Sequence, residues 1–101
     1  MTRETFFREI KNLVDQKKVL KNPQKGVSTL IRITKNDHIC YRRGNSEIYV
    51  SIDVIFDVYK KYKGKKCTSK DLRTLKYKTF ENKPCNITFT IMILKELGLW
   101  G

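Results

Sequence analysis

The chain has 101 residues, with 22 Lys or Arg against 10 Asp or Glu, so its formal net charge at neutral pH is +12. The hydrophobic fraction of 40% excludes a disordered chain, and no apolar run approaches the roughly 20 residues of a membrane-spanning helix. At this length we expect one small basic domain over residues 1–101. A core of this size is marginally stable alone, so binding to a partner or forming a homodimer would be unsurprising.

The cysteines and the N-terminal segment bear on the compartment. Residues 1–16 mix acidic and basic side chains and contain no apolar stretch of the kind found in secretory signals. The three cysteines, Cys40, Cys67 and Cys85, are odd in number and far apart in the sequence. We therefore expect reduced thiols and a cytoplasmic location.

The first predicted element is an amphipathic helix over residues 2–20. Phe6, Ile10 and Val14 recur at helical spacing, and Thr2 is suited to cap the N-terminus. Asn22-Pro23 should end this helix, and residues 21–26 are expected to form a loop.

Three β-rich segments follow the loop. They are "VSTLIRIT" at 27–34, "HICYRR" at 38–43 and "EIYVS" at 47–51, separated by short turns of polar residues and Gly44. Because the connections have hairpin length, the segments predict a three-stranded antiparallel meander.

The second half of the chain is predicted to be helical. One helix should run from Ser51 to about Tyr62 and end at Gly64, and a short helix should cover about 69–76. The second helix is opened by Thr68 and Asp71, which have the spacing of a capping box.

The last segment is ambiguous in its pattern. "ITFTIMI" is rich in β-branched residues and favours a strand, whereas "MILKELG", with Gly98 as a stop, favours a helix. We interpret 86–97 as a buried helix capped by Asn86. The predicted fold is therefore α+β, with an N-terminal helix, a three-stranded antiparallel meander and a three-helix, helix-turn-helix-like segment.

Residues 51–100 resemble winged-helix, helix-turn-helix DNA-binding domains. The resemblance lies in the helix start "TSKDL" and in a later helix ending in Leu94, Leu97, Gly98 and Leu99. That family places a β-hairpin wing after its last helix, whereas here the strands come before the helices. Its recognition helix is also polar, whereas 86–97 is mostly apolar. The resemblance implies DNA binding but assigns no base-reading residue.

The positive charge is concentrated in one segment. Residues 60–83 carry ten bases against Asp71 and Glu81, so they hold a net charge of +8 out of the total of +12. Nine of the ten bases are Lys, which suits phosphate contact more than base reading. Tyr62 and Tyr77 add aromatic surface that could stack on a base. The candidate nucleic-acid-binding residues of this segment are these two tyrosines with Lys60, Lys61, Lys63, Lys65, Lys66, Lys70, Arg73, Lys76 and Lys78.

A second candidate phosphate site is the pair Arg42 and Arg43. Both precede the predicted turn at Gly44, so two guanidinium groups and the turn amides could hold one phosphate. An exposed hairpin tip without function is the competing interpretation.

No motif points to a metal, a cofactor or catalysis. His38, Cys40, Cys67 and Cys85 are zinc-binding residue types, but their spacing matches no zinc motif. Asp53, Asp57 and Glu47 are more simply helix-dipole and ion-pair partners than the acids of a nuclease. We therefore expect no enzyme, no metal site and no cofactor.

The leading hypothesis is a non-catalytic accessory or regulatory protein that binds DNA or RNA through its phosphates. The alternative is a small basic protein-interaction module. Its size and charge would suit an inhibitor from a phage or mobile element that occupies an acidic or nucleic-acid-binding face of a host defence nuclease, as anti-CRISPR proteins do.

Overall fold

The structure, a computed structural model, describes residues 1–22, 26–63 and 65–101. These residues form two compact units, Met1–Ile52 (unit 1) and Asp53–Gly101 (unit 2). The predicted stop signals at Pro23 and Gly64 lie outside the described residues. The expectation of a single domain over the whole chain stays a prediction.

Unit 1 begins with helix α1 (Arg3–Asp15). The Thr2 hydroxyl accepts a 3.1 Å hydrogen bond from the Thr5 amide, which confirms the predicted cap. Phe6, Ile10 and Val14 are buried, as their spacing indicates. The helix ends earlier than predicted because Lys17 adopts a left-handed backbone conformation with φ of 52°, which an α-helix cannot contain.

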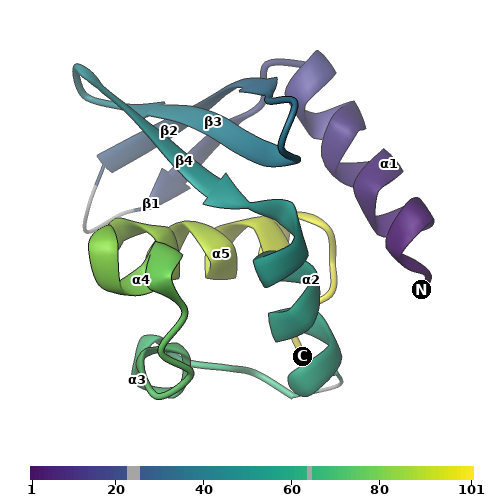
Figure 1. The fold of residues 1–101 in the computed structure, drawn as a ribbon. Coiled ribbons are helices and arrows are strands. Elements are labelled where there is room, and N and C mark those ends of the chain that lie inside the picture. The colour runs from purple at the N-terminus through teal and green to yellow at the C-terminus, as the bar shows by residue number, and fades with distance from the viewer. Residues whose placement is uncertain (23–25, 64) are drawn as a thin grey trace. The chain divides into compact units, whose positions relative to one another are not determined.

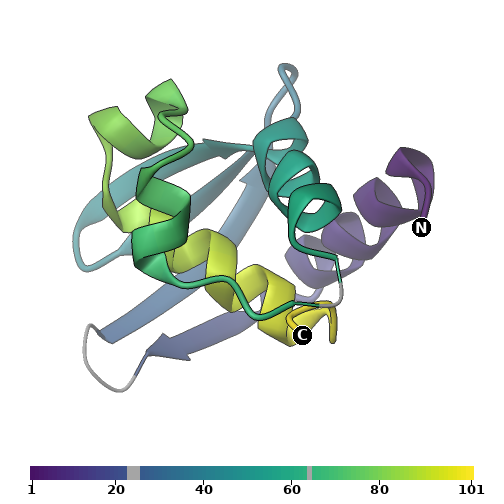
Figure 2. The same cartoon turned by 90° about the horizontal axis from the view of Figure 1, so that it is seen from below.

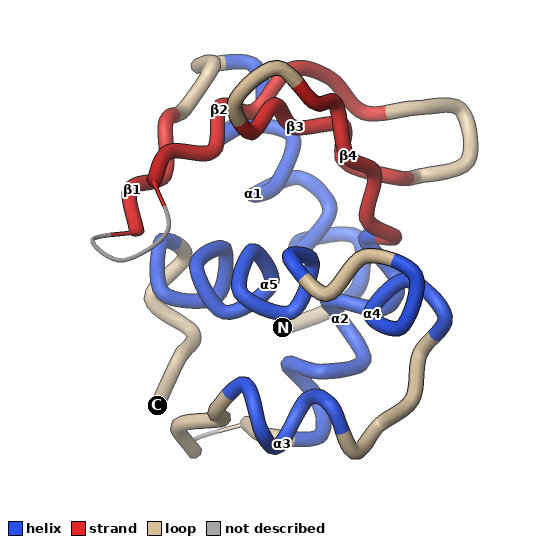
Figure 3. The backbone as a smooth tube through the Cα atoms, turned by 90° about the vertical axis from the view of Figure 1, so that its left-hand side faces the viewer, coloured by secondary structure: helices blue, strands red, loops and turns tan. Residues whose placement is uncertain are grey.

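The chain after α1 forms a four-stranded antiparallel sheet in the order β1-β2-β3-β4 (Figures 1 and 3). The strands are β1 (Val19–Asn22), β2 (Gly26–Ile33), β3 (His38–Arg43) and β4 (Ser46–Ser51). The predicted three-stranded meander is therefore wrong. The helix predicted over residues 2–20 includes residues 19 and 20, but Val19 pairs with Thr29, and Leu20 is buried as part of a fourth strand.

One face of this sheet is apolar and buried. Its side chains are Leu20, Leu30, Ile39, Tyr41, Ile48 and Val50. Helix α1 packs against β2. The pairing of β2 with β3 shifts register between Leu30 and Arg32, which is a β-bulge at Ile31. The bulge changes which face the following residue occupies, so Arg32 is paired with Cys40 on the opposite face of the sheet.

The described residues of unit 2 form α2 (Ile52–Lys61), α3 (Ser69–Arg73), α4 (Lys78–Asn82) and α5 (Cys85–Glu96), with α2 beginning at the boundary between the units. Helices α3 and α4 contact α5 and each other (Figure 2). The predicted three-helix segment is wrong because the chain forms α4 as an additional helix. Helix α3 stops at Arg73, and Lys76 then adopts a left-handed conformation with φ of 56°. Phe80 is buried and anchors α4.

The last segment is a helix and not a strand. Helix α5 buries Ile87, Phe89, Ile93 and Leu94, and it ends just before Gly98, whose φ of 71° and amide bond to the Lys95 carbonyl confirm the predicted stop. Asn86 is not the cap. It lies inside the helix and is fully buried. Its side-chain amide nitrogen donates hydrogen bonds to the carbonyl oxygen and the hydroxyl oxygen of Thr79. No helix in the described residues has the length and hydrophobicity required to cross a membrane.

Candidate nucleic-acid interface

The basic segment, defined as residues 60–63 and 65–78, occupies one connected part of unit 2. It begins in the last turn of α2, continues through a connection into α3 and ends at the first residue of α4 (Figures 1 and 2). All nine of its Lys and Arg residues are exposed: Lys60, Lys61, Lys63, Lys65, Lys66, Lys70, Arg73, Lys76 and Lys78. The fold therefore leaves every predicted cation of this segment accessible to an anion.

Few of these charges are neutralised within the protein. The Lys60 ammonium lies 3.6 Å from an Asp57 carboxylate oxygen and 5.0 Å from the Phe56 ring centroid. In the part of the chain that the structure describes, the other eight cations form no ion pair with a carboxylate. The positive potential of the segment is thus largely uncompensated.

The acidic residue inside the segment has a structural role. Asp71 accepts a 2.9 Å hydrogen bond from the Thr68 amide, and the Thr68 hydroxyl accepts one of 3.2 Å from the Asp71 amide. This reciprocal pair is the predicted capping box, now confirmed. It fixes the start of α3 and so the placement of Lys70 and Arg73, which are one helical turn apart.

Trp100 connects the C-terminal residues to the basic segment. Its indole N–H donates a 2.8 Å hydrogen bond to the Cys67 carbonyl oxygen. The ammonium groups of Lys66 and Lys95 lie 5.3 Å and 4.2 Å from its ring centroid, within the range of cation–π attraction. Sequence reasoning missed both Lys95 and Trp100. The single Trp of the chain was the available signal, since Trp is enriched at interfaces.

A pocket of about 210 Å³ opens beside α3. Phe80 and Ile87 are almost completely buried and supply its apolar lining, while Arg73 and Lys76 add positive charge. Pro84 and Glu81 complete the wall. The pocket combines an apolar interior with two cations and one carboxylate, and it lies at the end of the basic segment.

The two predicted stacking residues are only partly accessible. Tyr62 and Tyr77 are half-buried, and the Tyr77 ring meets the Phe80 ring edge-on at a centroid distance of 5.6 Å. Burial, together with the negative charge of Asp57, raises the pKa of Tyr77. The Tyr77 ring therefore helps to position Phe80 in the pocket wall, and only part of it faces solvent.

Arg42 and Arg43 belong to unit 1 and occupy consecutive positions of β3. Side chains of consecutive strand residues point to opposite faces of a sheet, so the two guanidinium groups leave the strand in opposite directions. Arg42 is exposed and lies 3.7 Å from a Glu47 carboxylate oxygen, whereas Arg43 is half-buried. The turn between β3 and β4 contains Gly44 at φ of 60°.

The cysteines are placed apart. Cys40 is buried in unit 1, while Cys67 is buried and Cys85 half-buried in unit 2. Burial raises the pKa of the Cys40 and Cys67 thiols, so both favour the neutral form. Within the described ranges, no group of three or more His, Cys, Asp or Glu residues is arranged to hold a metal ion.

Comparison with known proteins gives no relative. No protein-family model, curated protein or solved structure matches this chain. The resemblance of residues 51–100 to winged-helix domains therefore stays a prediction.

Proposed function

We propose that this protein binds nucleic acid through its phosphate backbone, using the basic segment, and that it does so without catalysis. The observation that carries the proposal is the set of eight exposed cations with no carboxylate partner in the described residues. Phosphates supply the missing negative charge, and their binding releases the counterions condensed on the nucleic acid. Because all but one of the nine cations are Lys, we expect them to recognise the charge of the phosphates and not the sequence of the bases.

The experiment compares two triple variants with equal net charge. In the first, Lys65→Gln, Lys70→Gln and Arg73→Gln remove three cations of the basic segment. In the second, Arg8→Gln, Lys11→Gln and Lys35→Gln remove three exposed cations of unit 1. Fluorescence anisotropy measures binding to labelled single- and double-stranded DNA and RNA. The proposal expects the first variant to bind at least about 10-fold more weakly than the second, because each lost phosphate contact lowers affinity.

The rival function is binding to an acidic protein, and the pocket beside α3 favours it. An apolar interior next to Arg73 and Lys76 also suits an apolar side chain followed by acidic residues. Unchanged nucleic-acid affinity in the first triple variant, with loss of binding to a defined acidic protein, would favour this rival. An equal loss of nucleic-acid affinity in both triple variants would indicate that binding depends only on the total charge of the protein.

A further inference from the structure

The sheet of unit 1 has a second face that the proposed function does not use. Residues of this outer face alternate along each strand with the buried ones, as the strand register requires. They include Val19 and Lys21 on β1, Val27, Thr29 and Arg32 on β2, Cys40 and Arg42 on β3, and Glu47 and Tyr49 on β4. These nine residues carry three positive charges, on Lys21, Arg32 and Arg42, and one negative charge, on Glu47.

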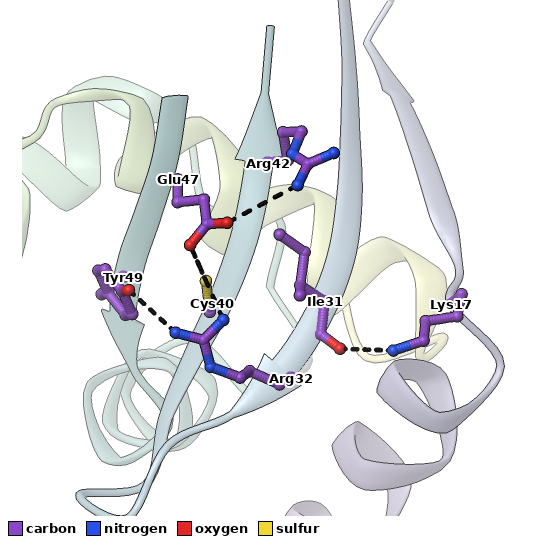
Figure 4. Close-up of polar contacts among 7 residues, drawn as sticks. All are labelled: Lys17, Ile31, Arg32, Cys40, Arg42, Glu47 and Tyr49. Atoms are coloured by element: carbon purple, nitrogen blue, oxygen red, sulfur yellow. Dashed lines mark hydrogen bonds and ion pairs between the residues drawn. The ribbon is translucent and has the colours of Figure 1, made fainter. Parts of the chain in front are cut away.

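Tyr49 is held on the outer face by Arg32. An Arg32 guanidinium nitrogen donates a 3.2 Å hydrogen bond to the Tyr49 hydroxyl, and the guanidinium carbon lies 6.0 Å from the ring centroid (Figure 4). The β-bulge at Ile31 makes this possible, since it brings Arg32 onto the same face as Cys40 and its neighbour Tyr49. These contacts favour one orientation of the ring.

Glu47 orients the two arginines of the face. One carboxylate oxygen lies 3.8 Å from Arg32 and the other lies 3.7 Å from Arg42 (Figure 4). Both ion pairs are solvent-exposed, with more than half of each Arg side chain accessible, so each is weak and easily exchanged for a phosphate. Cys40 lies among these side chains and is fully buried.

The outer face also exposes apolar surface. Among the described residues, four large hydrophobic side chains are exposed, and three of them are Val19, Val27 and Tyr49 of this face, at 43%, 46% and 43%. Tyr49 is the aromatic one of the three, and its ring lies beside the Arg32 guanidinium group. Unpaired nucleic-acid bases offer a flat apolar surface, and their phosphates offer the complementary charge.

We propose that the outer face binds single-stranded nucleic acid, with one base stacked on Tyr49 and the flanking phosphates near Arg32 and Arg42. Val27 on β2 and Val19 on β1 lie two and three strands away from β4, so they contact bases or sugars further along the same nucleic-acid strand. A duplex cannot use this face in the same way because its bases are stacked internally and are not free to lie on a protein ring. This site uses residues of unit 1 and none of the basic segment, so it can be tested independently of the proposed function.

The test uses the full chain and a labelled single strand of about 15 nucleotides, with a hairpin duplex for comparison. Tyr49→Leu removes the ring and keeps apolar bulk, while Tyr49→Phe keeps the ring and removes the hydroxyl. The proposal expects Tyr49→Leu to weaken single-strand binding about 10-fold, with duplex binding changed less than about 2-fold. Tyr49→Phe should bind the single strand within about 2-fold of the natural protein.

A second measurement does not depend on the folding of a variant. The natural protein is irradiated in complex with a single strand carrying 5-bromouracil, and the crosslinked residue is located by mass spectrometry. A crosslink at Tyr49 supports the proposal, and crosslinks confined to the basic segment overturn it. Unchanged single-strand affinity in Tyr49→Leu also overturns the proposal. If that variant instead loses binding to an acidic peptide, the outer face binds protein and the proposal is likewise overturned. If the triple variant of the basic segment loses nucleic-acid binding and Tyr49→Leu does not, the proposed function is supported and the binding site on the outer face is overturned.

Discussion

Trp100 donates a 2.8 Å hydrogen bond to the carbonyl oxygen of Cys67, a residue 33 positions earlier in the sequence. The contact fixes the connection that carries Lys65 and Lys66 against the end of α5, where Lys95 also lies over the Trp100 ring. It is a tertiary contact that holds part of the basic segment in place. The strength of the Trp100–Cys67 hydrogen bond therefore affects how rigidly Lys65 and Lys66 are held.

Replacing Trp100 should loosen this connection. Trp100→Ala removes the hydrogen bond, two cation–π contacts and part of the packing, so we expect unfolding free energy to fall by about 2 kcal/mol. Trp100→Phe keeps a ring and should lose about half as much. Urea denaturation followed by circular dichroism measures both, because this signal does not depend on the only Trp of the chain. Equal stability of the natural protein and Trp100→Ala would contradict the role of this contact.

The contribution of the capping box to the local stability of α3 should be measurable. Thr68→Ala removes the hydroxyl that accepts from the Asp71 amide, and such a loss typically costs about 1 kcal/mol. Hydrogen exchange should therefore speed up at the amides of α3, with a smaller effect on α5. Ser69→Ala changes the neighbouring residue, which is not the cap, and serves as the control. The assignment of the capping box fails if both variants exchange alike.

Stability should fall in alkaline solution. Burial raises the pKa of Cys40, Cys67 and Tyr77 in the folded state, so these groups favour folding while they are protonated. Their contribution is complete below the unfolded thiol pKa of about 8.5 and is lost as pH rises through the folded values. The Tm should therefore decrease as the pH rises above about 8.5, first through the thiols and at higher pH also through Tyr77.

The variant Cys67→Ala separates this effect from general alkaline unfolding. It lacks one of the buried thiols, so its Tm should fall less steeply over the same pH range than that of the natural protein. A parallel Cys85→Ala variant changes a half-buried thiol and serves as the comparison. A Cys67→Ala profile as steep as the natural one would show that the Cys67 thiol does not contribute.

Thiol accessibility gives an independent check of the packing. Cys85 is half-buried, whereas Cys40 and Cys67 are buried, so iodoacetamide should label Cys85 first in the folded protein. Mass spectrometry of the labelled peptides gives the order. Fast labelling of Cys40 would contradict its burial among Arg32, Glu47 and Tyr49 on the outer face of the sheet.

The features predicted correctly from sequence are local ones. The Thr2 cap, the Thr68–Asp71 box and the stop at Gly98 each depend on residues within a few positions of one another. The missed features depend on distant partners. β1 is a strand because Val19 pairs with Thr29, and only the left-handed backbone at Lys17 frees those residues from α1.

The candidate sites show the same limit. The concentration of lysine in residues 60–78 was visible in the sequence, and the fold leaves all nine cations exposed. The arrangement of Arg32 beside Tyr49 was not visible, because it follows from a β-bulge that alternation along a single strand cannot reveal. Trp100 likewise reaches Cys67 only in the folded chain.

The most direct test of the central claim is the salt dependence of nucleic-acid binding. The logarithm of the association constant should fall linearly with the logarithm of salt concentration, with a slope of about 0.9 per phosphate neutralised on duplex DNA. We predict a steep slope for the natural protein and for the control Arg8→Gln, Lys11→Gln, Lys35→Gln. The slope should be shallower by about 2 to 3 for Lys65→Gln, Lys70→Gln, Arg73→Gln. No binding at low salt, or equal slopes in all three proteins, would contradict phosphate binding by the basic segment.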